Sequence, residues 1–172
     1  MHAKNYRAVK GQSYTRKEFA KGFPASKITK FTMGDTKRQF DYEVKLVALE
    51  GAQIRHIALE AARVASNRIL IDKLVNNYRL DILTYPHNIL RENKMIFGAH
   101  ADRLQQGMRG SFGKPIGTAA RVRVDQAIIA VGVNSEGVEA AKVALKRSSA
   151  KFPIPCRIVV EKRQVQEAKL VE

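Results

Sequence analysis

A glycine-rich segment, residues 98–117, constrains the fold most, because it separates two stretches of apolar sequence and has little tendency to form helix or strand. It holds five of the chain's 11 glycines together with the cations Arg103, Arg109 and Lys114. A loop of this length is uncommon inside a compact domain, and an ordered one usually has a function of its own. Glycines let backbone approach a partner closely, and Arg and Lys donate hydrogen bonds to phosphate oxygens. The sequence therefore predicts a folded domain from which a loop suited to binding phosphate groups projects.

Alternation of apolar and polar residues on both sides of this loop predicts strands. In the first of them, Phe40, Tyr42, Val44 and Leu46 alternate with charged residues. Residues 118–133 have the pattern of one long strand that becomes continuously apolar where it enters a buried sheet. The predicted strands cover residues 40–46, 78–84, 88–97, 118–133 and 154–161.

Helical periodicity predicts two helices. The first covers residues 52–74, and the second begins at Asn134 or Ser135 and ends before Pro153. The side chains expected to face the core from the first helix are Ile54, Ile57, Ala58, Ala61, Ala65 and Ile69. This order of elements indicates an α+β fold, a two-layer α/β sandwich with two helices packed on a mainly antiparallel sheet. Residues 39–172 are expected to form this single domain, with the projecting loop 98–117 inside it.

Residues 1–38 are expected to form a basic arm that leads into the domain. They contain ten Lys or Arg against Glu18 and Asp35, a net charge of +8 out of +15 for the whole chain. Aromatic residues lie between these cations, which suits stacking on RNA bases or packing on the domain, and a flexible solvated tail is the alternative. The arm cations expected to bind RNA are Lys4, Arg7, Lys10, Arg16, Lys17, Lys21 and Lys27.

Further cations follow the loop. Arg121 and Arg123 alternate on the strand that leaves it and are expected to extend the RNA-binding surface. Along and after the second helix, RNA contact and a favourable interaction with the helix C-terminus are equal alternatives. The residues in question there are Lys142, Lys146, Arg147 and Lys151.

The sequence gives little support for an enzyme or for a metal-binding protein. A nucleotide-binding P-loop needs a glycine five residues before its Gly-Lys pair and a Ser or Thr after it, but Met108 and Pro115 occupy those positions. Cys156, the single cysteine, lies on the apolar face of a predicted strand and is expected to be a buried thiol. His100 and Asp102 would be the acid and base of an RNA-processing enzyme, yet a glycine-rich loop gives them no rigid support. We expect no catalytic residue, metal or cofactor.

The sequence also argues against a membrane protein. No apolar run approaches the roughly 18 residues that span a bilayer, and the N-terminal residues lack the apolar centre of a signal peptide. We therefore expect an intracellular protein with no membrane partner.

The run ADRLQQGMRGSFGKPIGTAARV resembles the signature of a universal large-subunit ribosomal protein family, called L sixteen in bacteria and L ten e in archaea and eukaryotes. The similarity extends to KITKF, ALEAARVASNR and YPHNILRENKM and so covers nearly the whole chain. The chain stops after Glu172 without the C-terminal extension of eukaryotic relatives, which together with the style of the loop suggests an archaeal member.

The resemblance implies a hammerhead-type sandwich and a structural role in cytoplasmic ribosomes rather than catalysis. It implies binding to large-subunit ribosomal RNA, a contribution to the aminoacyl-tRNA site, and contacts with tRNA, neighbouring ribosomal proteins and assembly factors, without homo-oligomers. The loop would reach toward the tRNA acceptor end near the peptidyl-transferase centre. The residues that would face tRNA are Arg103, Gln105, Arg109, Phe112 and Lys114. A free-standing RNA-binding regulator is the main alternative, and an RNA-processing enzyme is a weaker one.

Overall fold

The structure, a computed structural model, describes residues 4–94, 96–98, 103 and 107–163. Its larger sheet has five strands in the order β1-β4-β7-β2-β8, and every neighbouring pair is antiparallel. The central strands β7 and β2 are the most apolar, as expected for strands with a neighbour on each side. The strands are β1 (Thr32–Gly34), β2 (Tyr42–Ala48), β4 (Arg79–Ile82), β7 (Ala127–Val133) and β8 (Cys156–Lys162).

A smaller antiparallel sheet, in the order β3-β6-β5, carries the loop. Its strands are β3 (Ala52–Arg55), β5 (Asn88–Glu92) and β6 (Lys114–Val122). Residues 52–55 are therefore a strand rather than the first turn of a helix. The single long strand predicted for residues 118–133 is also wrong, because a turn with Asp125 at a φ of 60° divides it into β6 and β7, which belong to different sheets.

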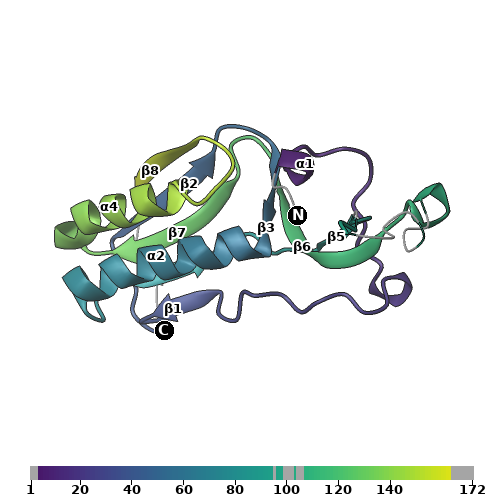
Figure 1. The fold of residues 1–172 in the computed structure, drawn as a ribbon. Helices are drawn as coiled ribbons and strands as arrows, with labels where there is room; N and C mark the ends of the chain where they lie inside the picture. Colours follow the sequence, from purple (N-terminus) through teal and green to yellow (C-terminus); the bar gives the residue numbers. More distant parts are fainter. Residues whose placement is uncertain (1–3, 95, 99–102, 104–106, 164–172) are drawn as a thin grey trace, which may run out of the picture.

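Two long helices, α2 (His56–Leu74) and α4 (Val138–Ser149), lie side by side on one face of the larger sheet (Figure 1). Because residues 52–55 are a strand, the buried face of α2 differs from the predicted one, and Ile57 is exposed. The residues of α2 that are buried are His56, Leu59, Ala62, Ser66 and Leu70.

In α4, Ala141, Ala144 and Leu145 face the core and are fully buried. The helix begins at Val138, after the short 3-10 turn η3 (Ser135–Gly137), and neither Asn134 nor Gly137 caps it through a side chain. The other short helices are α1 (Lys4–Arg7), η1 (Lys17–Phe19) and η2 (Gly107–Gly110).

The main core lies between the two helices and the larger sheet. Side chains from both layers fill it, including Leu59 and Leu70 from α2 and Val44 and Val131 from the sheet. This arrangement confirms the predicted α+β sandwich, although the strands form two sheets instead of one. In the described part of the chain, no helix is long and apolar enough to cross a bilayer. The division between arm and domain at residue 38 stays a prediction, and β1, which lies on the arm side of it, pairs with β4.

Candidate nucleic-acid interface

The first part of the arm crosses the smaller sheet and is fastened to it by its own backbone. The Arg121 guanidinium, on β6, donates hydrogen bonds to the carbonyl oxygens of Lys10 (3.3 Å), Gly11 (2.9 Å) and Gln12 (3.0 Å). A single planar guanidinium can serve several acceptors in this way because its donors are held in a fixed fork. The structure therefore brings Arg121 and the arm together, as a clamp on three successive peptide groups.

Two buried amides, which the sequence reasoning missed, fasten the arm on either side of this clamp. Gln53 Nε2 donates to the carbonyl oxygen of Ala8 at 3.0 Å, and Asn88 Oδ1 accepts a hydrogen bond from the Tyr14 amide at 2.7 Å. Asn88 Nδ2 also donates to Gln53 Oε1, and the Ile89 amide donates to the Tyr14 carbonyl at 2.7 Å. The signal in the sequence was a polar residue at a buried position of each strand, because such groups require partners.

His56 holds a later part of the arm. Its Nδ1 accepts a hydrogen bond from the Lys27 amide at 3.0 Å, which places the imidazole proton on Nε2. The ring lies at the junction of β3 and α2, beside Gly117 of β6, where an added Cβ would approach Nε2 to 3.0 Å. Burial lowers the pKa of His56, and the charges of Lys27 and Arg55 lower it further. The imidazole is therefore neutral near pH 7.

With its backbone held, the arm presents its cations to solvent. All seven predicted RNA-binding residues of the arm are exposed, but Arg7 pairs with Glu50 at 2.6 Å and Arg16 with Glu18 at 2.9 Å. Among the residues that the structure describes, no ion pair involves the remaining five. These five are Lys4, Lys10, Lys17, Lys21 and Lys27.

The aromatic residues of the arm divide between packing and exposure. Phe31 stacks on Tyr85 with ring centroids 5.3 Å apart, whereas Phe19 is exposed with the Arg16 guanidinium 4.4 Å from its ring centroid. Packing of Phe31 and the hydrogen bond from the Tyr6 hydroxyl to the Arg91 carbonyl agree with the expectation that some of these rings serve the domain. An arm held at so many points is not a solvated tail over residues 8–31.

At the other end of the smaller sheet, the described loop residues Arg103, Arg109, Phe112 and Lys114 are exposed, and Gln105 lies outside the described residues. Phe112 is 80% exposed, which leaves its ring face open to a partner. The loop contains η2, and its ends differ from the predicted 98–117. The strand predicted for residues 88–97 ends at Glu92, and β6 begins at Lys114, which pairs with Glu92.

Arg91, another residue that the sequence reasoning missed, joins the arm to the loop. Its guanidinium lies 5.5 Å from the ring centroid of Tyr14 and 5.8 Å from that of Phe112, and it donates to the Gly113 carbonyl at 3.2 Å. Cation–π contacts of this kind hold rings at a set orientation. The signal was an arginine at the end of a strand that enters the glycine-rich loop.

The remaining candidates are dispersed. Arg123 is exposed in the turn after β6, and its backbone amide donates to Gln126 Oε1 at 2.9 Å. Cys156 is half-buried, and burial raises the pKa of its thiol, in agreement with an unreactive side chain. His100 and Asp102 lie outside the described residues. Within the described ranges, no group of three His, Cys, Asp or Glu could hold a metal.

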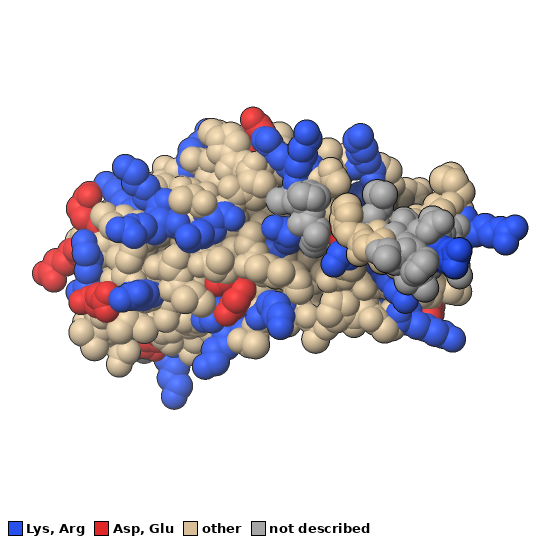
Figure 2. Space-filling model, in the orientation of Figure 1, with Lys and Arg blue, Asp and Glu red and all other residues tan. Residues whose placement is uncertain are grey.

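The charge on the surface is uneven. Figure 2 shows Lys and Arg side chains along the whole length of one face, whereas most acidic side chains on that face lie toward the end away from the loop. A basic surface on a folded body, with exposed rings beside the cations, is typical of structural proteins that bind nucleic acid.

Comparisons with known proteins identify the family. Residues 9–159 match the model of the family described as "Ribosomal protein L16p/L10e". Proteins named "Large ribosomal subunit protein uL16" are similar to the chain over nearly its whole length. The one from Staphylothermus marinus is 52% identical over 158 residues, 91% of each chain. The one from Picrophilus torridus is 50% identical over 161 residues, 93% of this chain and 92% of the relative. The one from Sulfolobus acidocaldarius is 51% identical over 158 residues, 90% of each.

The chain therefore belongs to the L16p/L10e family of ribosomal proteins, and its relatives make it an archaeal member. This confirms the resemblance found in the sequence. It also confirms that the protein is structural and not an enzyme.

Proposed function

We propose that this ribosomal protein is a structural constituent of the large subunit in cytoplasmic ribosomes, where it binds ribosomal RNA through the arm and helps form the aminoacyl-tRNA site through the loop. The observation that supports this most is the fastening of the arm, since Arg121, Gln53 and Asn88 hold its backbone while its lysines stay exposed. Cations presented on a fixed path lose little entropy when they meet phosphates.

The loop is the part proposed to reach tRNA. Arg103, Arg109 and Lys114 supply charge for phosphates, and Phe112 supplies an exposed ring for stacking. Neighbouring ribosomal proteins and assembly factors are the further partners proposed, with one copy of the chain in each subunit.

Sedimentation of native cell extract tests the proposal. We expect the protein to migrate with the large subunit and to stay there after a high-salt wash, because stacking and hydrogen bonds persist where salt weakens the phosphate contacts. A mainly free population would contradict the proposal and would favour a free-standing RNA-binding regulator.

A further inference from the structure

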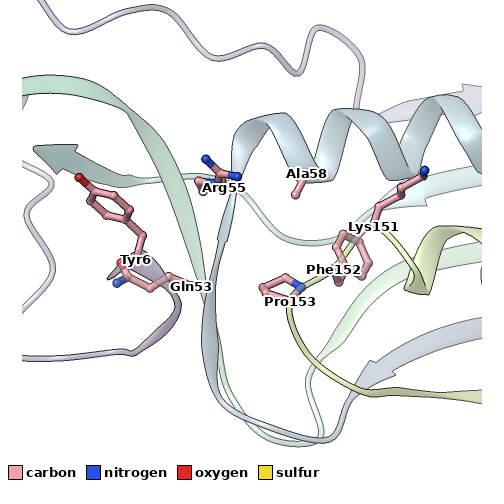
Figure 3. A pocket seen from close by; sticks show the side chains of 7 residues that line it. All are labelled: Tyr6, Gln53, Arg55, Ala58, Lys151, Phe152 and Pro153. Carbon is pink, nitrogen blue, oxygen red and sulfur yellow. The ribbon is translucent and has the colours of Figure 1, made fainter. Parts of the chain in front are cut away.

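A hollow of about 220 Å³ lies apart from the loop, where four segments of the chain meet. These segments are α1, β3, the first turn of α2 and the connection from α4 to β8 (Figure 3). In Figure 3, Tyr6 and Gln53 stand on one side and Phe152 and Pro153 on the other, with Arg55 and Ala58 between them. Of the residues that the sequence offered for RNA contact, only Lys151 lines this hollow.

The wall on the α4 side is apolar and rigid. Phe152 is part of the main core and only 9% exposed, and Pro153 and Ala58 continue the surface that it offers. The backbone here is held, since the Lys151 amide donates to the Ser148 carbonyl at 2.9 Å and the Phe152 amide to the Ser149 carbonyl at 3.1 Å. A flat apolar wall of this kind suits a planar ring.

The opposite side is equally fixed. The Tyr6 hydroxyl donates to the Arg91 carbonyl at 3.2 Å, and Gln53 is tied to both Ala8 and Asn88. The hollow is therefore formed before any partner arrives, and a partner would meet little cost of ordering these side chains.

The rim of the hollow is positively charged. Arg55 and Lys151 line it, and no acidic side chain does. Lys151 is exposed and takes part in none of the ion pairs found in the described part of the chain. A partner that combines a planar apolar surface with a negative charge matches both the wall and the rim.

We propose that the hollow receives one unstacked nucleotide of ribosomal RNA, with its base against Phe152 and Pro153 and its phosphate beside Lys151. The inference rests on the proposed function and adds a site to it. Proteins recognise RNA chiefly through splayed bases that stack on side chains while phosphates meet cations. An apolar side chain of a neighbouring protein would use the wall but would offer no negative charge to Lys151.

Filling the hollow without changing charge is the first test. Ala58→Leu should weaken binding of the full-length protein to large-subunit ribosomal RNA by about 5- to 100-fold, the range expected for loss of one stacked base. The dependence of log K on log salt should change its slope by no more than about one, because the Lys151 contact is the most that can be lost with the base. Ala61→Leu is the matched control, since Ala61 is exposed on the same helix outside the hollow, and it should bind like the wild type.

The rim is tested separately. Lys151→Ala should make the salt slope shallower by about one, whereas Lys142→Ala should leave it unchanged, because Lys142 is already paired with Glu139 at 2.7 Å. A photoreactive p-benzoylphenylalanine at position 151 in assembled large subunits should crosslink to RNA. A crosslink to a protein would overturn the inference, and this result does not depend on whether Ala58→Leu folds.

The failures of the two proposals are distinguishable. If the wild-type protein does not bind large-subunit RNA, the proposed function fails. If the wild type binds and Ala58→Leu binds equally well with unchanged circular dichroism, only the nucleotide site is wrong.

Discussion

At the scale of single residues, Arg121 shows that surroundings decide what a cation does. The sequence placed it beside Arg123 as an RNA-binding residue, yet three of its hydrogen bonds go to carbonyl oxygens of the arm. Arg123, two residues later, is exposed in a turn. RNA contact stays a prediction for both, but Arg121 acts on the interface by positioning the arm.

His56 makes the attachment of the arm sensitive to pH. Because its folded-state pKa lies below the ordinary 6.5, the unfolded chain binds a proton more readily than the folded one. The contribution of neutral His56 to the free energy of unfolding is therefore complete above about pH 6.5. It is lost as the pH falls through that value toward the folded-state pKa. Protonation of Nδ1 would also break the hydrogen bond that this atom accepts from the Lys27 amide, because two N–H groups would then face each other.

We expect the wild type to lose more free energy of unfolding between pH 7.5 and 5.5 than His56→Asn, whose side-chain oxygen can accept the same hydrogen bond without titrating. Chemical denaturation at each pH measures this. His87→Asn is the matched control, because it makes the same substitution at an exposed histidine that does not hold the Lys27 amide. Equal pH dependence of wild type and His56→Asn would contradict the assignment.

Gly113 fixes the base of the loop through a backbone-to-backbone contact. Its φ is +65°, and an added Cβ would lie 2.3–2.4 Å from backbone atoms of Glu92 and Asn93. Gly113→Ala should therefore cost more than about 2 kcal/mol, since the strain of a positive φ adds to displacement of β5. Gly22→Ala, at a φ of +74° with open space around it, should cost only about 1 kcal/mol. Thermal unfolding of both variants provides the measurement, and equal losses would show that crowding at Gly113 is relieved cheaply.

At the scale of elements, periodicity predicted the types of most helices and strands but not two boundaries. The predicted apolar face of the first helix was wrong, because it began at Ile54, which belongs to β3. The four residues of β3 continue directly into α2, and no proline or glycine marks the change from strand to helix. The boundary between β6 and β7 was missed because Asp125 has to adopt a positive φ, which local apolar alternation does not reveal. Short strands of a second sheet depend on partners distant in sequence.

The loop and the sheet that carries it should be separable. Removing residues 95–111 leaves Asn93, Lys94, Phe112 and Gly113 between the paired residues Glu92 and Lys114, a length that suits a hairpin. We expect the melting temperature to stay within about 4 °C of the wild type, or about 1–2 kcal/mol for a chain of this size. Large subunits assembled with the variant should bind aminoacyl-tRNA more weakly than subunits assembled with the wild type. A variant that does not fold would mean that the loop is structural.

At the scale of the whole molecule, the sequence predicted which surfaces are basic but not what holds them. The arm, the loop and Arg121 were all recognised as cationic, whereas the contacts that join them connect residues up to 111 positions apart, as between Lys10 and Arg121. Such pairs have no signature in local spacing. Gln53, Asn88 and Arg91 were missed for this reason, since each has its role only once the sheet and the arm are placed together.

The arm lysines should dominate the salt dependence of RNA binding. Lys10 and Lys17 take part in no ion pair in the part of the chain that the structure describes, so we expect Lys10→Ala with Lys17→Ala to reduce the salt slope by about 2. The control double variant, Lys45→Ala with Lys142→Ala, removes the same charge from lysines paired with Glu161 and Glu139 and should change the slope little. Equal slopes for the two double variants would show that the arm lysines are solvated.

Because the arm is held through its backbone carbonyl oxygens, its length is more restricted than its amino-acid sequence. Arg121 and Gln53 can hold any residue at positions 8, 10 and 12, because every residue offers the same carbonyl oxygen, whereas the φ of +62° at Gly11 favours glycine. An inserted or deleted residue between Ala8 and Tyr14 would instead move these carbonyls away from donors fixed in the sheet. Among relatives, this stretch should therefore keep its length and its glycine at position 11, and a cation at position 10 for RNA, while its other residues vary.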